Sequence, residues 1–179
     1  MRASAFGVLA ACVLLSACSS TLGGTAQPQP APPVQSSANR VAAGEPCALL
    51  SPEQASGLGL VAEGEFVPGE RARLMPPSCQ WAQSDPASEL DSLTAGLETT
   101  FSLATYMDGA EPLETLEYGG RTWGHYPDPL TGGSVCMLAI ELSETSFIVL
   151  TASDFSDPER ACDVAKAAAP QVTANLSGT

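Results

Sequence analysis

The sequence is poor in positive charge. Its 179 residues contain 7 lysines and arginines against 20 aspartates and glutamates, which gives a formal net charge of −13. Proteins bind nucleic acids, and anionic lipid headgroups, mainly through cationic side chains. The composition therefore excludes nucleic acid as a partner and argues against strong attraction to anionic lipids. We interpret the acidity as a device for solubility; the alternative is an acidic face for a cationic partner or for divalent ions.

Histidine is also scarce, since His125 is the only one in the chain. Any nucleophilic triad that depends on histidine must use it, but no G-x-S-x-G element accompanies Gly124–Pro127. Three acidic residues near the end of the chain, Asp154, Asp157 and Glu159, lack the glycine and the spacing of a calcium loop. We therefore expect no catalytic residue, no metal and no cofactor, and we expect His125 to be an exposed residue at a strand end.

Long apolar runs are missing except at the N-terminus. The segment from Ala3 to Leu15 follows the single positive charge of Arg2 and is well short of the roughly 20 residues that span a bilayer. It ends in Leu15-Ser16-Ala17-Cys18, which has the form of a bacterial lipobox. This pattern predicts a lipoprotein signal peptide over residues 1–17 and a diacylglyceryl group on Cys18, with two acyl chains that make release from the membrane slow.

There are two alternatives to lipidation at Cys18. A second box ends at Cys12, but cleavage there would leave an apolar core of only about half a dozen residues, below the usual length. The other alternative is an ordinary secretory signal, whose cleavage site has a small residue at the position that Leu15 occupies here. We therefore favour Cys18, and we expect the mature protein on the outer face of the cytoplasmic membrane, held there by its lipid.

Composition divides the rest of the chain into two parts. Residues 18–43 are rich in Ser, Pro, Gln and Gly and contain few large apolar side chains, which is typical of a disordered tether. A tether of this length has a typical reach of roughly 25 to 30 Å. Residues 44–179 match the commonest size of a single globular domain.

The cysteines also indicate a location outside the cytoplasm. With Cys12 removed and Cys18 lipidated, an even number remains in the domain: Cys47, Cys79, Cys136 and Cys162. Four cysteines in an exported domain predict two disulfides, and they lack the close pairs of a zinc site. Three pairings are possible. We prefer Cys47 with Cys79 and Cys136 with Cys162, because each closes a loop of about 30 residues and stabilises by roughly 3 to 4 kcal/mol.

Helix signals lie at both ends of the domain. Ser51, Pro52 and Gln54 form a capping-box start, and the glycines at 57 and 59 end a short helix there. At the other end, Ser156 or Asp157 precedes a long stripe of apolar residues spaced three and four apart: Cys162, Ala165, Ala169, Val172 and Leu176. We expect Pro170 to kink this helix or to end it early.

Strand signals lie between the two helices. Alternating patterns predict about five strands, over residues 79–82, 97–107, 121–126, 136–142 and 147–152, and the last two form a hairpin. The predicted fold is therefore α+β: a short N-terminal helix, an antiparallel sheet, and a C-terminal helix packed on the sheet. We expect Trp81 in the core, and we take Trp123, Tyr126 and Arg121 as weak candidates for a ligand-binding surface.

The order of these motifs resembles the actinobacterial lipoprotein family called domain of unknown function 3558. The features that carry the resemblance are the lipobox, the tether, Pro46–Pro52, Cys79-Gln80-Trp81, the strand with Cys136, and Asp157-Pro158 before Cys162. The resemblance covers essentially the whole mature chain. It implies a cell-envelope lipoprotein of a family without an established activity, and so it supplies no catalytic residues.

The function predicted from the sequence is binding. Without a recognisable nucleophile or metal set, we expect a non-enzymatic domain that binds a protein partner or an envelope ligand. The alternatives are a cell-wall hydrolase and a carrier of lipids or other hydrophobic molecules, and a carrier would need an apolar cavity between the sheet and the helices.

Overall fold

The computed structural model describes residue 41 and residues 44–85, 92–127 and 134–176. The predicted signal peptide, Cys18 and nearly all of the predicted tether lie outside these described residues. Val41 is an exception, because it is only 6% exposed and packs into the core. The folded domain thus includes a residue that composition assigns to the tether. Within the described part of the chain, no helix is long and apolar enough to cross a membrane.

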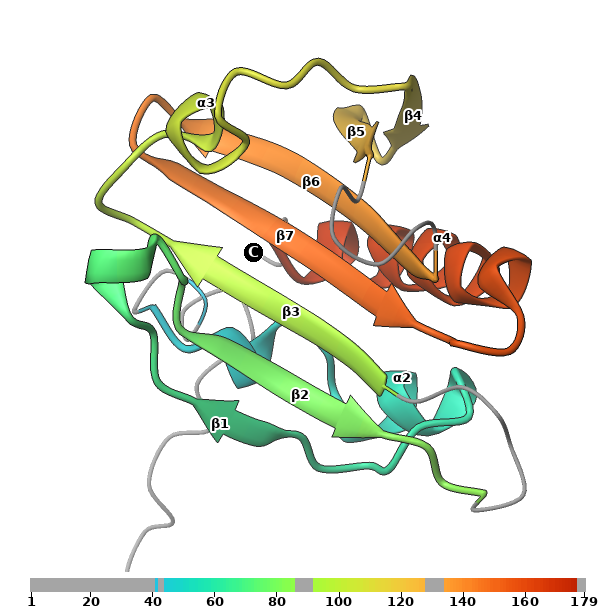
Figure 1. Cartoon of the computed structure of the whole chain (residues 1–179). Helices are drawn as coiled ribbons and strands as arrows, with labels where there is room; N and C mark the ends of the chain where they lie inside the picture. Colours follow the sequence, from blue (N-terminus) through green and yellow to red (C-terminus); the bar gives the residue numbers. More distant parts are fainter. Residues whose placement is uncertain (1–40, 42–43, 86–91, 128–133, 177–179) are drawn as a thin grey trace, which may run out of the picture. The chain divides into compact units, whose positions relative to one another are not determined.

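A single antiparallel sheet organises the described residues, with the strand order β1-β2-β3-β7-β6-β5-β4 (Figure 1). The strands are β1 (Glu65–Val67), β2 (Ser78–Ala82), β3 (Ser92–Glu98), β4 (Glu114–Tyr118), β5 (Arg121–Tyr126), β6 (Val135–Ser143) and β7 (Ser146–Ser153). The α+β class and the β6–β7 hairpin are confirmed, but the sheet has 7 strands rather than about five. The two additional strands, β1 and β4, form its edges.

The segment after β3 differs from the predicted strand over 97–107. Strand β3 ends at Glu98, and α3 (Leu103–Tyr106) follows as a short helix. The buried carboxylate of Glu98 accepts hydrogen bonds from the N–H groups of Thr99 and Thr100, at 2.8 and 2.7 Å, which turns the chain out of the sheet. Ser102 Oγ then accepts a hydrogen bond from Thr105 N and caps the helix. These local side-chain contacts override the alternating apolar pattern.

Short helices precede and interrupt the first strands. They are η1 (Pro46–Ala48), α2 (Pro52–Gly57) and η2 (Arg71–Arg73). The predicted capping box of α2 is present: Ser51 Oγ accepts from Gln54 N at 3.3 Å, and Gln54 Oε1 accepts from Ser51 N at 2.8 Å. The capping box thus satisfies the backbone N–H groups of Ser51 and Gln54.

Helix α4 (Pro158–Leu176) begins at a carboxylate cluster. Asp157 Oδ1 accepts from Arg160 N and caps the helix, while the fully buried Asp154 accepts from the N–H groups of Ser156 and Asp157 and from Arg160 Nε. Burial raises the pKa of Asp154, but these donors outweigh it and hold the pKa at about 2. The ionised carboxylate of Asp154 thus fixes the connection between the end of β7 and the start of α4. The helix continues through Pro170 to Leu176, so the expectation of an early end is wrong.

The main core lies between the sheet and the helices η1, α2 and α4, which are on one side of it (Figure 1). Its largest buried side chains include Trp81, Trp123, Leu138, Leu150 and Val172. Trp81 is buried, as predicted. On the opposite face, α3 covers a smaller cluster around Phe147 and Val149. The sheet is therefore packed on both faces, although the second layer is small.

Both disulfides tie a helical segment to the sheet. Cys47 of η1 is bonded to Cys79 of β2, and Cys136 of β6 is bonded to Cys162 of α4. This is the pairing that the loop lengths favoured. The first bond fixes the start of the domain against one half of the sheet, and the second fixes α4 against the other half.

Candidate functional site

An open pocket of about 610 Å³ lies beside the first turns of α4. Its lining comes from β5, the start of β6, α4 and the residues that flank β4 and β5: Leu113, His125, Tyr126, Pro127, Val135, Pro158, Glu159, Cys162, Asp163 and Lys166. The volume is within the range of small-molecule sites, which is roughly 300 to 1,000 Å³. The Cys136–Cys162 disulfide reaches this pocket through Cys162.

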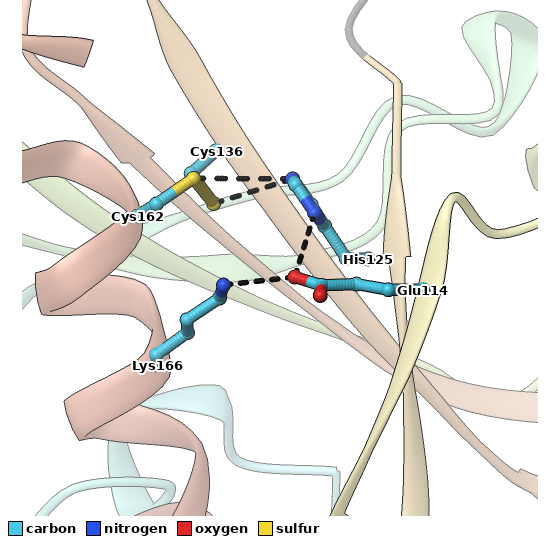
Figure 2. A network of polar contacts seen from close by, with 5 residues as sticks. All are labelled: Glu114, His125, Cys136, Cys162 and Lys166. Carbon is cyan, nitrogen blue, oxygen red and sulfur yellow. Dashed lines mark hydrogen bonds and ion pairs between the residues drawn. A yellow bond between two sulfur atoms is a disulfide. The ribbon is translucent and has the colours of Figure 1, made fainter. Parts of the chain in front are cut away.

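A chain of polar contacts crosses the pocket wall (Figure 2). Lys166 Nζ donates to Glu114 Oε1 at 2.8 Å, and the same oxygen is 3.3 Å from His125 Nδ1. The other ring nitrogen, Nε2, lies 3.6 Å from Cys136 Sγ and 3.9 Å from Cys162 Sγ. The imidazole is thus held between a carboxylate and a disulfide.

Sheet register explains why these residues meet. Glu114 of β4 is directly opposite His125 of β5, so both side chains are on the same face of the sheet. His125 is opposite Leu138 of β6, which places Cys136 on that same face, diagonally across. Cys162 and Lys166 come from α4 and are one helical turn apart, so both face the sheet at this point. Four elements therefore supply the five side chains.

Negative charge exceeds positive charge in the pocket. The ammonium group of Lys166, through its hydrogen bond and its charge, lowers the pKa of the Glu114 carboxyl, and His125 adds a smaller effect in the same direction. Lys166 is therefore already paired. Glu159 and Asp163 are exposed on the adjacent face of α4, and no ion pair joins either of them to another described residue. The pocket is acidic as a result.

The three weak candidates for ligand binding have different positions. Trp123 is fully buried against α4, where its indole N–H donates to Thr173 Oγ1 at 3.0 Å, so its expected place on the surface is wrong. Tyr126 borders the pocket, but its ring lies over Gly124. Arg121 borders a smaller pocket of about 280 Å³, whose lining also includes Leu97 and Leu176. The structure therefore does not bring the three together.

His125 lies near the end of β5, as predicted, but its predicted exposure is wrong. We expected an exposed residue at a strand end, but its side chain is 20% exposed and lies against the disulfide. Glu114 and Lys166 were missed altogether, since they are 52 residues apart and neither has a local motif. The one available signal was the conjunction of the single histidine with a cysteine 11 residues later on the next strand.

Three residues of the site, His125, Cys136 and Cys162, are of types that bind metal ions. The donor atoms of His125, Cys136 and Cys162 lie within 4.8 Å of one another. Thiolates bind metals, whereas the two sulfurs here are joined to each other in a disulfide. The oxidised protein therefore offers the imidazole and the nearby carboxylates at this position, but not the thiolate ligands that a zinc site would use.

A family model described as "Protein of unknown function (DUF3558)" matches residues 13–175. The match spans most of the chain, including both disulfides and all the residues of the pocket. No match was found among curated proteins or among solved structures.

Proposed function

The chain belongs to the DUF3558 family of proteins of unknown function, and from its own residues we propose that it is a lipid-anchored binding protein of the cell envelope. In this proposal the pocket beside α4 holds a small organic cation that also has an apolar part. The observation that carries the proposal is the pair of exposed carboxylates, Glu159 and Asp163, which form no ion pair with the described part of the chain and lie at a pocket whose one lysine is already paired.

The envelope location rests on two features of the chain. Leu15–Cys18 has the form of a lipobox, and the domain contains two disulfides, which persist in oxidising compartments outside the cytoplasm. Mass spectrometry of the protein extracted from membranes should find a diacylated Cys18 at the mature N-terminus, and Cys18→Ala should abolish both the modification and the cleavage, so that the chain keeps residues 1–17. An unmodified chain secreted freely would contradict the anchor.

The ligand class follows from the charge and shape of the pocket. An anionic ligand would approach Glu159 and Asp163, and Lys166 offers little compensation because Glu114 neutralises it. A cation gains from both carboxylates at once. The acidity of the whole mature chain, 6 basic against 20 acidic residues after residues 1–17 are removed, attracts cations toward the domain over a longer range.

Four apolar residues also line the pocket. Leu113 is 67% exposed at the pocket, and Pro127, Val135 and Pro158 add further carbon surface. Burial of such apolar surface under a ligand is favourable by roughly 25 cal/mol per Å². An amine attached to a ring or a short alkyl group would therefore use both parts of the pocket.

Three probes of nearly the same shape test the ligand class. Phenethylamine, 2-phenylethanol and phenylacetate differ mainly in charge, and we expect affinity to fall in that order, as measured by titration with amide chemical shifts. Glu159→Gln combined with Asp163→Asn should weaken phenethylamine about three- to ten-fold, in line with partly exposed charge pairs.

Glu63 and Glu65 provide the matched control for this pair. They are exposed, lie in or beside β1 at the opposite edge of the sheet, and carry the same total charge. Glu63→Gln with Glu65→Gln should leave phenethylamine binding within about two-fold, because only long-range attraction is reduced. Equal affinity for the three probes, or an equal loss in both double variants, would contradict the proposed site.

A further inference from the structure

The two cysteines of the Cys136–Cys162 disulfide differ in exposure, since Cys162 is half-buried and Cys136 is covered. Cys162 lines the pocket, whereas Cys136 is fully buried in the main core. His125 Nε2 is within 4 Å of both sulfurs and slightly nearer to that of Cys136. An external reagent can therefore approach Cys162 while the imidazole faces the sulfur that would leave.

We propose that this disulfide exchanges with an external thiol and that His125 is the proton donor and acceptor for Cys136. The inference goes beyond ligand binding, because it assigns a reaction to the same pocket. The reagent class is a small uncharged or cationic thiol, since Glu159 and Asp163 repel an anionic one.

Thiol–disulfide exchange at Cys162 replaces one S–S bond with another and moves one proton to Cys136. The thiolate of the reagent attacks Cys162 Sγ from the pocket, and its electron pair forms a new S–S bond while the Cys162–Cys136 bond breaks. The bonding pair leaves on Cys136 Sγ, which takes the proton of protonated His125 Nε2. In the reverse step, His125 removes that proton, Cys136 attacks Cys162 Sγ, and the reagent departs as a thiolate.

Glu114 positions the imidazole for this role. Its contact with Nδ1 favours a proton on that nitrogen, which leaves Nε2 directed at the sulfurs (Figure 2). Lys166 in turn fixes the carboxylate. A sulfur, an imidazole and an orienting carboxylate in sequence form the arrangement by which enzymes activate cysteine nucleophiles and stabilise cysteine leaving groups.

The other disulfide is a control built into the same molecule. Cys79 is also fully buried, but the backbone of Gly64 packs tightly over it, since a Cβ at Gly64 would lie 2.4 Å from Cys79 Sγ. The chain has a single histidine, and it is at the other disulfide. Cys47–Cys79 therefore has a covered sulfur without a proton donor of this kind.

Competition between the two disulfides tests the proposal. The oxidised protein is treated with limiting 2-mercaptoethanol, quenched with acid and alkylated, and the peptides are quantified by mass spectrometry. We expect Cys136–Cys162 to open faster than Cys47–Cys79 by about ten-fold or more, and the mixed disulfide to form on Cys162. Equal rates, or a mixed disulfide on Cys136, would overturn the proposal.

Two variants separate proton transfer by His125 from a packing effect. His125→Asn should slow the opening of Cys136–Cys162 by about ten-fold or more while Cys47–Cys79 opens at its original rate. In His125→Ala, added imidazole should restore the rate at Cys136–Cys162 alone, which a purely structural role of the side chain would not produce. An unchanged rate in His125→Asn, or no rescue by imidazole, would count against the assignment. Should both variants fail to fold, the wild-type rate ratio and the site of the mixed disulfide still decide it.

Discussion

Replacing Trp123 with alanine should lower the free energy of unfolding by about 3 to 5 kcal/mol, the usual loss when a buried tryptophan is truncated. Trp123 is fully buried in β5 against α4, and the variant leaves a cavity there. It also removes the indole N–H that donates to Thr173 Oγ1 at 3.0 Å. Because Thr173 Oγ1 donates to Ala169 O, the hydroxyl would keep that hydrogen bond but lose its donor partner.

Urea unfolding followed by far-ultraviolet circular dichroism measures this loss. Phe66→Ala is the matched control, because it also truncates an aromatic residue on a strand but at a side chain that is 55% exposed; a surface change of this kind usually costs within about 0.5 kcal/mol. Thr173→Val should be intermediate, at about 1 to 3 kcal/mol, since it leaves the buried indole N–H without an acceptor. Comparable losses for Trp123→Ala and Phe66→Ala would refute the assignment of Trp123 to the core.

Removal of the Cys47–Cys79 disulfide should have an effect of similar size. The double variant Cys47→Ala with Cys79→Ala opens a loop with a sequence separation of 32, for which the chain-entropy model gives about 3 to 4 kcal/mol. The reason is that the bond restricts the unfolded chain more than it restricts the folded one. The first helical segments would then be held to β2 by packing and hydrogen bonds alone.

The second disulfide supplies the comparison. Cys136→Ala with Cys162→Ala opens a loop with a sequence separation of 26, so the same model predicts a nearly equal loss. Both double variants should be measured by denaturant unfolding without reductant, because they contain no free thiols from the broken pairs. A loss below about 1 kcal/mol for Cys47→Ala with Cys79→Ala would contradict the expected role of that bond.

Local signals allowed much of the fold to be predicted. Ser51 and Gln54 mark the start of α2, and the alternation of Cys136, Leu138 and Ile140 marks β6, because each pattern is determined by a few neighbouring residues. The preferred disulfide pairing follows from loop length in a similar way. Such features do not depend on which other segments are nearby.

The missed elements depend on their neighbours. Strand β4 alternates Leu116 and Tyr118 with exposed polar residues, and β1 is 3 residues long with little burial. As edge strands, both are stabilised by pairing with β5 and β2 rather than by apolar burial of their own. In contrast, the pattern over 97–107 was apolar enough for a strand, but the hydrogen bonds of Glu98 and Ser102 end the strand and start a helix.

The candidate site was the least predictable feature for the same reason. No local pattern connects Glu114, His125 and Lys166, since their contacts arise from the register of β4 with β5 and from the docking of α4. Even the pairing of Cys136 with Cys162, which loop length favoured, does not indicate that His125 lies beside it. The chemistry of the pocket becomes visible only when strand order and helix position are both known.

Strand order also determines how the domain can assemble. At the centre of the sheet, β3 pairs with β7, so Glu98 is opposite Phe147, and the strands that come between them in sequence lie beyond β7 on the far side. The first three strands therefore lack their central neighbour until the C-terminal hairpin has been synthesised. Such non-local pairing slows folding. Strands β4 to β7 each pair with the next strand in sequence, whereas β1 to β3 join the sheet only through β7, so the complete sheet should form in a late step.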